Sequence, residues 1–136
     1  PRFNDWYDAG NHRYYIANDQ HPDNNVAEGE LLIQEVYQSI RKSKYWEKCV
    51  FVIVYDEHGG FFDHVAPPKT DKWGPGARVP TIVISPFANS GVDHTVYDTT
   101  AILKLIKQRW TRVTLTARVD EQADLATKAL NFTLPQ

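Results

Sequence analysis

Two acidic residues and a histidine, Asp56, Glu57 and His58, directly follow an apolar run at residues 50–55. Taking a carboxylate out of water costs roughly several kcal/mol unless a partner or a cation neutralises it. Two adjacent carboxylates at the end of a buried strand therefore suit a divalent cation, for which carboxylate oxygens are good ligands. The alternative is that both acids form salt bridges or cap a neighbouring helix, since acids are common at strand ends.

A glycine pair, Gly59 and Gly60, follows these acids. Glycine adopts backbone conformations that other residues avoid, so the chain can turn sharply here without a side chain filling the space. His58 and His64 lie on either side of this turn. Either histidine could hydrogen-bond the carboxylates from outside a metal's ligand shell, but for both we expect a structural role in holding the turn.

Two further residues have side chains that suit a phosphate group. His21 precedes Pro22 in a polar segment; its ring could donate a hydrogen bond to a phosphate oxygen or protonate a leaving alkoxide, and the alternative is a solvated turn histidine. Arg78 carries a planar guanidinium that can pair with a phosphate. An arginine entering a strand more often bridges a local acid, and both interpretations of Arg78 stay open.

These residues need elements that position them, and the hydrophobic pattern indicates alternating helices and strands. The uniformly apolar, β-branched run at 49–55 is typical of a strand buried on both faces of a parallel sheet, and 80–86 is a second such run. Apolar residues at helical spacing predict helices. The expected elements are an ordered loop over 1–27, a helix over 28–43, a helix after Asp98 as N-cap, and one more helix over 117–130.

This order predicts an open, mainly parallel α/β sheet with flanking helices, and in such sheets ligands bind at the carboxyl ends of the strands. Asp56 and Glu57 fall at such an end. A net charge of -2 without a long basic run argues against nucleic acid as a partner. No stretch approaches the roughly 20 apolar residues of a transmembrane segment. The single cysteine, Cys49, leaves the redox compartment open.

Longer motifs resemble a known family. These motifs are "NDQHP" at 18–22, "YDEHGGFFDHVAPP" at 55–68, "GPGARVPTIVISPFA" at 74–88 and "SGVDHTVYDTTAILKLI" at 90–106. Together they make nearly the whole chain resemble the bacterial-type phosphoesterase family. That family contains phospholipases C and acid phosphatases and belongs to the alkaline-phosphatase-like superfamily. The resemblance implies that Asp56 and Glu57 are metal ligands and that His21 reaches the phosphoryl oxygens of the substrate.

The resemblance also implies what this chain lacks. Family members carry a Glu-Asn pair of metal ligands near their N-terminus and a Ser or Thr nucleophile farther along, and both precede the part that corresponds to Pro1. The chain also contains no methionine. We therefore expect residues 1–136 to be the C-terminal part of a single phosphoesterase domain, incomplete as an enzyme by itself, with a partner segment that supplies the remaining ligands.

Two functions follow from the sequence. The first is part of a metal-dependent phosphoric ester hydrolase that acts on a phospholipid or a phosphomonoester, with a divalent ion of undetermined identity as cofactor. The second is a non-catalytic α/β module that retains a vestigial metal or phosphate site and binds a phosphorylated ligand or partner. The family resemblance further suggests a secreted or periplasmic location.

Overall fold

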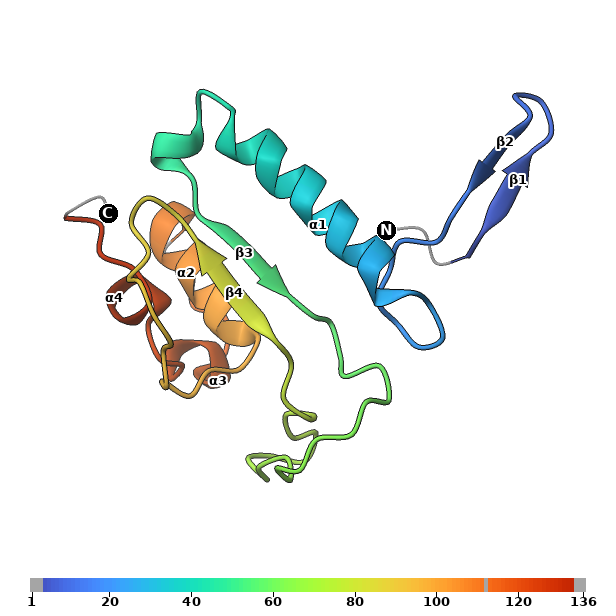
Figure 1. Ribbon diagram of the computed structural model, residues 1–136. Helices are drawn as coiled ribbons and strands as arrows, with labels where there is room; N and C mark the ends of the chain where they lie inside the picture. Colours follow the sequence, from blue (N-terminus) through green and yellow to red (C-terminus); the bar gives the residue numbers. More distant parts are fainter. Residues whose placement is uncertain (1–3, 112, 134–136) are drawn as a thin grey trace.

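The structure is a computed structural model that describes residues 4–111 and 113–133. It is a small α/β arrangement with two separate two-stranded sheets (Figure 1). No helix in these two ranges is long and apolar enough to span a membrane. In chain order the elements are β1 (Trp6–Asp8), β2 (Arg13–Tyr15), α1 (Val26–Arg41), the 3-10 helix η1 (Trp46–Lys48), β3 (Phe51–Val54), β4 (Thr81–Ile84), α2 (Thr100–Trp110), α3 (Ala117–Asp120) and α4 (Leu125–Lys128).

The two apolar runs form β3 and β4, as the sequence predicts, but they pair antiparallel. Phe51 lies opposite Ile84, and Val54 lies opposite Thr81. The expected parallel pairing is therefore wrong. Parallel neighbours need a crossover connection, usually a helix, whereas residues 55–80 contain no helix and return the chain directly beside β3.

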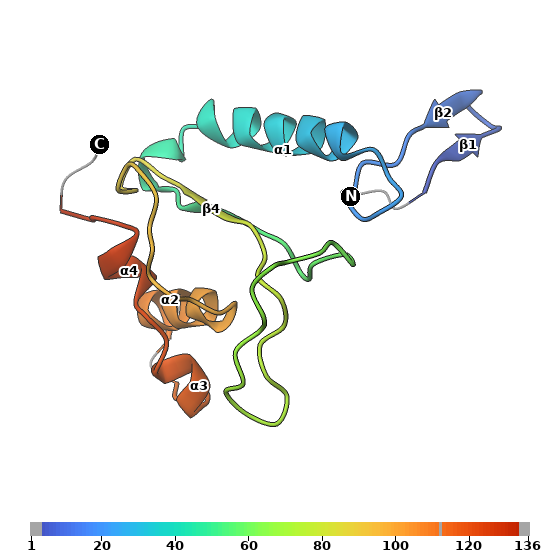
Figure 2. The same cartoon turned by 60° about the horizontal axis from the view of Figure 1, so that its bottom comes forward.

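Helices lie on both sides of this sheet. Figures 1 and 2 together place α1 on one side of the β3–β4 pair and α2 on the opposite side. The strand residues are nevertheless only partly buried, and Ile82 remains 54% exposed. The sequence predicts strands buried on both faces, and the difference arises because the pair has no neighbouring strand among the described residues.

Helix α1 begins and ends close to the predicted bounds. Asn25 caps it, because its side-chain oxygen accepts a hydrogen bond from the backbone N of Ala27. Glu28 in the first turn and Arg41 in the last complement the helix dipole. Gly29 is buried in this helix because Gln20 lies against it: a Cβ at position 29 would lie only 2.3 Å from Cγ of Gln20.

The N-terminal segment is more regular than the predicted loop. Strands β1 and β2 form an antiparallel hairpin, and the rings of Trp6 and Tyr15 stack with centroids 4.7 Å apart. Asp8 organises the turn between the strands, since its Oδ1 accepts hydrogen bonds from the backbone N of Gly10 and Asn11. Such short strands have no sustained period in the sequence, and only their pairing distinguishes them from a loop.

The C-terminal part packs as a small helical cluster in which α2 contacts α3 and α4. Residues 117–130 form two short helices rather than one, because Thr116 and Asp124 each cap a new start with a side-chain oxygen. Asp98 precedes the observed cap residue, Thr99, but its Oδ1 still accepts a hydrogen bond from the backbone N of Thr100, 2.7 Å away. Asp98 therefore still accepts a hydrogen bond from the first turn of α2, although it is not the cap residue itself.

Candidate active site

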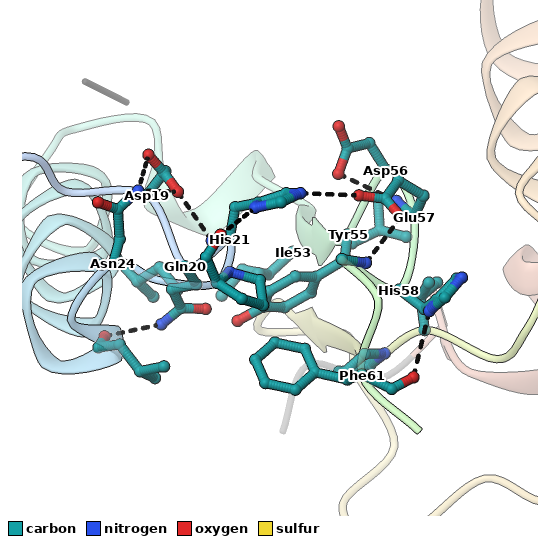
Figure 3. A pocket seen from close by; sticks show the side chains of 18 of the residues that line it. Asp19, Gln20, His21, Asn24, Ile53, Tyr55, Asp56, Glu57, His58 and Phe61 are labelled. Carbon is teal, nitrogen blue, oxygen red and sulfur yellow. Dashed lines mark hydrogen bonds and ion pairs between the residues drawn. The ribbon is translucent and has the colours of Figure 1, made fainter. Parts of the chain in front are cut away.

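A cavity of about 1310 Å³ lies at the carboxyl end of β3, between this strand, the first half of α1 and the segment before α1 (Figure 3). Five of the six candidate residues line it, namely His21, Asp56, Glu57, His58 and Arg78. His64 is not among the lining residues. The structure therefore brings these five predicted residues together at the carboxyl end of β3.

The two acids are held by the turn that follows them. Oδ1 of Asp56 accepts a hydrogen bond from the backbone N of Glu57 at 3.0 Å, and Oε2 of Glu57 accepts one from the backbone N of Gly59 at 2.7 Å. Gly59 has a φ of 62°, and a Cβ there would lie 3.1 Å from Cδ of Pro22. A glycine at this position thus lets the acidic turn approach the segment that carries His21.

His21 faces Glu57 across the cavity. Nε2 of His21 lies 3.8 Å from Oε1 of Glu57, and both side chains are more than half exposed. The other ring nitrogen, Nδ1, lies 2.5 Å from the carbonyl oxygen of Pro22. Since a carbonyl oxygen only accepts hydrogen bonds, we assign the proton to Nδ1. Nε2 is then the nitrogen that can accept or release a proton in the cavity.

Two residues that the sequence reasoning missed hold His21 in place. Asp19 is buried, and its Oδ1 accepts a hydrogen bond from the backbone N of His21 at 2.7 Å. The side-chain amide of Asn24 donates to both oxygens of Asp19, at 2.9 and 2.8 Å. An aspartate two residues before the histidine is the pattern of an Asx-turn, and this was the signal in the sequence.

The segment is also attached to α1. Nε2 of Gln20 donates hydrogen bonds to the carbonyl oxygen of Val26 at 3.1 Å and to Oε1 of Glu30 at 2.8 Å. With Gln20 lying against Gly29, the backbone on the N-terminal side of His21 rests on the first turns of the helix. Helix α1 therefore positions His21 relative to the acids that follow β3.

The other two histidines contact the turn and the solvent. Nδ1 of His58 lies 3.1 Å from both the backbone N of Gly60 and the carbonyl oxygen of Phe61, and with either tautomer one of these hydrogen bonds closes the glycine turn. His64 is exposed, with Nδ1 3.8 Å from Oδ1 of Asp63. Neither ring contacts the carboxylates of Asp56 or Glu57 through a hydrogen bond in the described chain.

Arg78 forms a two-pronged ion pair with Asp63. Its Nε donates to Oδ2 at 2.9 Å and its Nη2 to Oδ1 at 2.8 Å. The hydrogen bonds from Arg78, together with one from the backbone N of Val65, hold the pKa of Asp63 well below its usual range. Both residues line the cavity. The structure therefore shows Arg78 bridging a local acid, which is one of the two interpretations that the sequence left open.

The residues present fit a divalent cation in kind but not in number. Asp56 and Glu57 offer exposed carboxylate oxygens, the ligand type that hard cations prefer. Within residues 4–111 and 113–133, however, no group of three or more His, Cys, Asp or Glu side chains lies close enough together to hold a metal ion. The two acids therefore supply at most part of a ligand shell.

Comparison with known proteins identifies related sequences. A model of the Phosphoesterase family matches residues 6–113. Non-specific phospholipase C5 of Arabidopsis thaliana is 40% identical over 102 residues, which cover 63% of this chain and 19% of the relative. Non-specific phospholipase C6 of the same plant is 43% identical over 91 residues, which cover 55% of this chain and 18% of the relative.

A bacterial relative matches more of the chain. Phospholipase C B of Mycobacterium tuberculosis is 31% identical over 144 residues, which cover 85% of this chain and 28% of the relative. The chain thus spans less than a third of each of these relatives. Since the family model covers most of the sequence, from the β1–β2 hairpin to the end of α2, the chain belongs to the phosphoesterase family.

Proposed function

We propose that this chain contributes part of the active site of a metal-dependent phosphoric ester hydrolase of the phospholipase C or acid phosphatase type. One observation carries the proposal: Nε2 of His21 and Oε1 of Glu57 lie 3.8 Å apart in one cavity, with Asp56 beside them, although the two segments are far apart in the sequence. The similarity to proteins named phospholipase C supports the reaction class.

In this proposal Asp56 and Glu57 are two of the oxygen ligands of a divalent cation. When bound, such a cation offsets negative charge on the phosphate oxygens and lowers the pKa of a hydroxyl nucleophile. The two carboxylates lie at the open side of the turn, and the backbone N–H groups of Glu57 and Gly59 orient them by occupying one oxygen of each. The second carboxylate oxygen of each side chain is then left to bind the cation.

In this proposal His21 is the residue that donates a proton to the substrate. With Nδ1 held by the carbonyl oxygen of Pro22, Nε2 is directed to the cavity and can donate to a non-bridging phosphate oxygen or protonate the leaving alkoxide. Donation from Nε2 uses the doubly protonated ring, because the proton of the neutral ring is on Nδ1. Asp19 and Asn24 act through His21 by fixing the backbone that carries it.

The proposal has three further parts. Arg78, paired with Asp63 at the cavity wall, keeps guanidinium N–H groups that could contact a phosphate ester, whereas His58 and His64 have supporting roles. The nucleophile and the remaining metal ligands come from another segment of a longer protein, because the chain spans only 17–28% of its relatives. A secreted or periplasmic location accords with the family.

A non-catalytic module is the second candidate, and the absence of a three-residue ligand group among the described residues favours it. In that case the cavity binds a phosphorylated ligand or partner without turnover. The two candidates differ in whether the acids support turnover once the rest of a family protein is present, and a chimera can decide between them.

The test replaces the matching segment of the mycobacterial phospholipase C B with residues 6–113 of this chain and adds Asp56→Ala or Glu57→Ala. Each variant should lower turnover of a phosphodiester substrate by about a hundredfold or more, because it removes a charged ligand from the metal. Both side chains are exposed, so the free energy of unfolding should change by only about 0.5 kcal/mol.

Metal content, melting temperature and turnover are measured on the same preparations, with Glu47→Ala as the control at an exposed acid outside the cavity. Full metal occupancy with near-normal turnover in both variants would contradict the ligand assignment. A folded chimera that binds metal but has no turnover before any substitution would favour the non-catalytic module.

A further inference from the structure

Large apolar side chains gather on the loop that joins β3 to β4. Phe62 is 92% exposed and Trp73 is 78% exposed, and Phe61 and Val65 are exposed as well. Figures 1 and 2 show this loop extending beyond the end of the β3–β4 sheet, with its tip near α3. Single exposed apolar residues are normal, whereas several aromatic residues on a projecting loop mark an interaction surface.

Ion pairs hold this loop in shape. Asp63 and Arg78 close its base through the two hydrogen bonds described above. Near the tip, Oδ1 of Asp71 accepts hydrogen bonds from the backbone N of Trp73 and Gly74, and its Oδ2 accepts one from Nη1 of Arg118 at 3.1 Å. A loop held in this way loses little conformational entropy when it binds a surface.

The charges on the loop indicate what kind of surface it binds. The part of the loop that carries the exposed rings, residues 61–80, follows Asp56 and Glu57 and contains two acids, Asp63 and Asp71, both of which are paired with arginines. Lys69 and Lys72 are exposed, and Nζ of Lys72 lies 4.0 Å from the centroid of the Trp73 ring. The exposed part of the loop therefore combines aromatic rings with uncompensated positive charge. This combination suits the interface of a membrane, where aromatic rings enter the headgroup layer and lysines approach anionic lipids.

We propose that Phe62, Trp73 and the two lysines dock the protein on an anionic lipid surface. Phe61 and Phe62 also line the cavity, so docking brings the cavity to molecules held in the membrane. The inference rests on the proposed function in one respect, that the phosphate ester is a phospholipid. Binding to vesicles requires no turnover, so it can be measured separately.

The experiment measures cosedimentation of the 136-residue chain with phosphatidylcholine vesicles that contain or lack phosphatidylserine. Replacing Phe62 and Trp73 by Ser should weaken binding by about tenfold for each ring removed from the interface. Replacing Lys69 and Lys72 by Gln should weaken binding to the phosphatidylserine vesicles alone, by about fivefold for each lysine. Because all four side chains are exposed, these variants should melt like the parent chain.

Matched controls lie elsewhere on the molecule. Trp110→Ser removes a tryptophan that is 72% exposed at the end of α2, and Lys42→Gln with Lys44→Gln removes two exposed lysines after α1. These controls should bind as the parent chain does. Equal losses in loop and control variants would overturn the proposal, since binding would then be general adhesion.

Two other results would also overturn it. One is a parent chain that does not bind vesicles containing phosphatidylserine. The other is a loop variant that binds vesicles normally but loses self-association in sedimentation, which would assign the loop to a protein contact. Neither result concerns the metal ligands, and the chimera with Asp56→Ala and Glu57→Ala tests these independently.

Discussion

At the scale of single residues, the proposed roles of His21 and Glu57 depend on groups that hold them. Asp19 is buried and accepts three hydrogen bonds, one from the backbone N of His21 and two from the Asn24 side chain. Glu57 is oriented by the backbone N of Gly59. Each proposed functional group is thus fixed by a local turn.

Replacing Asp19 by Ala tests this dependence in the 136-residue chain. The change removes three part-buried hydrogen bonds, each of which contributes about 1 kcal/mol. The free energy of unfolding should therefore fall by about 2 kcal/mol or more in denaturant titration. Asp23→Ala, at an exposed acid in the same turn, is the control and should have little effect. Equal stability of both variants would contradict the role assigned to Asp19.

At the scale of elements, close approaches and ion pairs join segments that share few other contacts. The side chain of Gln20 packs directly against the backbone of Gly29 in α1. Arg118 at the start of α3 binds Asp98, before α2, through Nε at 2.8 Å, and binds Asp71 of the β3–β4 loop through Nη1. The segment with His21 and the projecting loop are both positioned through such links.

Gly29→Ala should be destabilising although alanine favours helices. In an unobstructed helix this change would stabilise by about 0.5 to 1 kcal/mol. Here a Cβ would lie 2.3 Å from Cγ and 2.9 Å from Cδ of Gln20, so Gln20 must leave its position and lose its hydrogen bonds. In the Gln20→Ala background the same change should recover the helix gain. Melting curves of the four proteins measure both effects, and stabilisation by Gly29→Ala alone would contradict the contact.

The link between α2 and α3 should weaken in acid. Burial raises the pKa of Asp98, but the hydrogen bonds from Thr100 and Arg118 outweigh it, so this pKa lies below the usual value. A depressed carboxyl pKa stabilises the folded state above the pKa of the unfolded chain, about 3.9, and this contribution is lost as the pH falls through the folded-state value.

The melting temperature of the parent chain should therefore fall below about pH 4, and Asp98→Asn should make this fall shallower. Melting curves between neutral and strongly acidic pH measure the difference. Glu47→Gln, at an exposed acid on η1, should reproduce the parent curve. An Asp98→Asn protein with the parent's pH dependence would show that this pair does not contribute.

At the scale of the whole molecule, the chain exposes more surface than its mass predicts. The accessible surface is 10425 Å² for 15.6 kDa, whereas a compact monomer of this mass exposes about 7,200 Å². The buried apolar residues of the described chain are few and mostly small or C-terminal, namely Ala17, Ala101, Val119, Leu125 and Leu130. The two-stranded β3–β4 sheet also leaves its outer edges unpaired within the described residues.

The purified chain should therefore associate as its concentration rises, because apolar patches and open strand edges favour contacts between copies. Sedimentation velocity over a concentration series measures the association, and calorimetry should show a broad, weakly cooperative transition. A chimera in which the rest of the family domain covers these surfaces is the comparison and should be less prone to associate. A monomer with one sharp transition at every concentration would contradict this prediction.

The sequence by itself determined the longer helices and strands and five of the residues that line the cavity. The helix at 26–41, the apolar strands β3 and β4, the start of α2 near Asp98 and the acids at the end of β3 follow from local signals. Hydrophobic periodicity and capping residues act within a few positions of the chain, so they can be read without knowing which segments meet. The sharp turn at Gly59 and Gly60 follows for the same reason, and both have positive φ.

Only the tertiary structure decided which segments meet. An apolar run is compatible with either pairing direction, and the helix-free return of residues 55–80 makes β3 and β4 antiparallel. The β1–β2 hairpin, the attachment of Gln20 to α1 and the choice of Asp63 as the partner of Arg78 likewise join separate segments of the chain. These contacts depend on packing and chain connection, whose energies belong to pairs of segments and are absent from either segment alone.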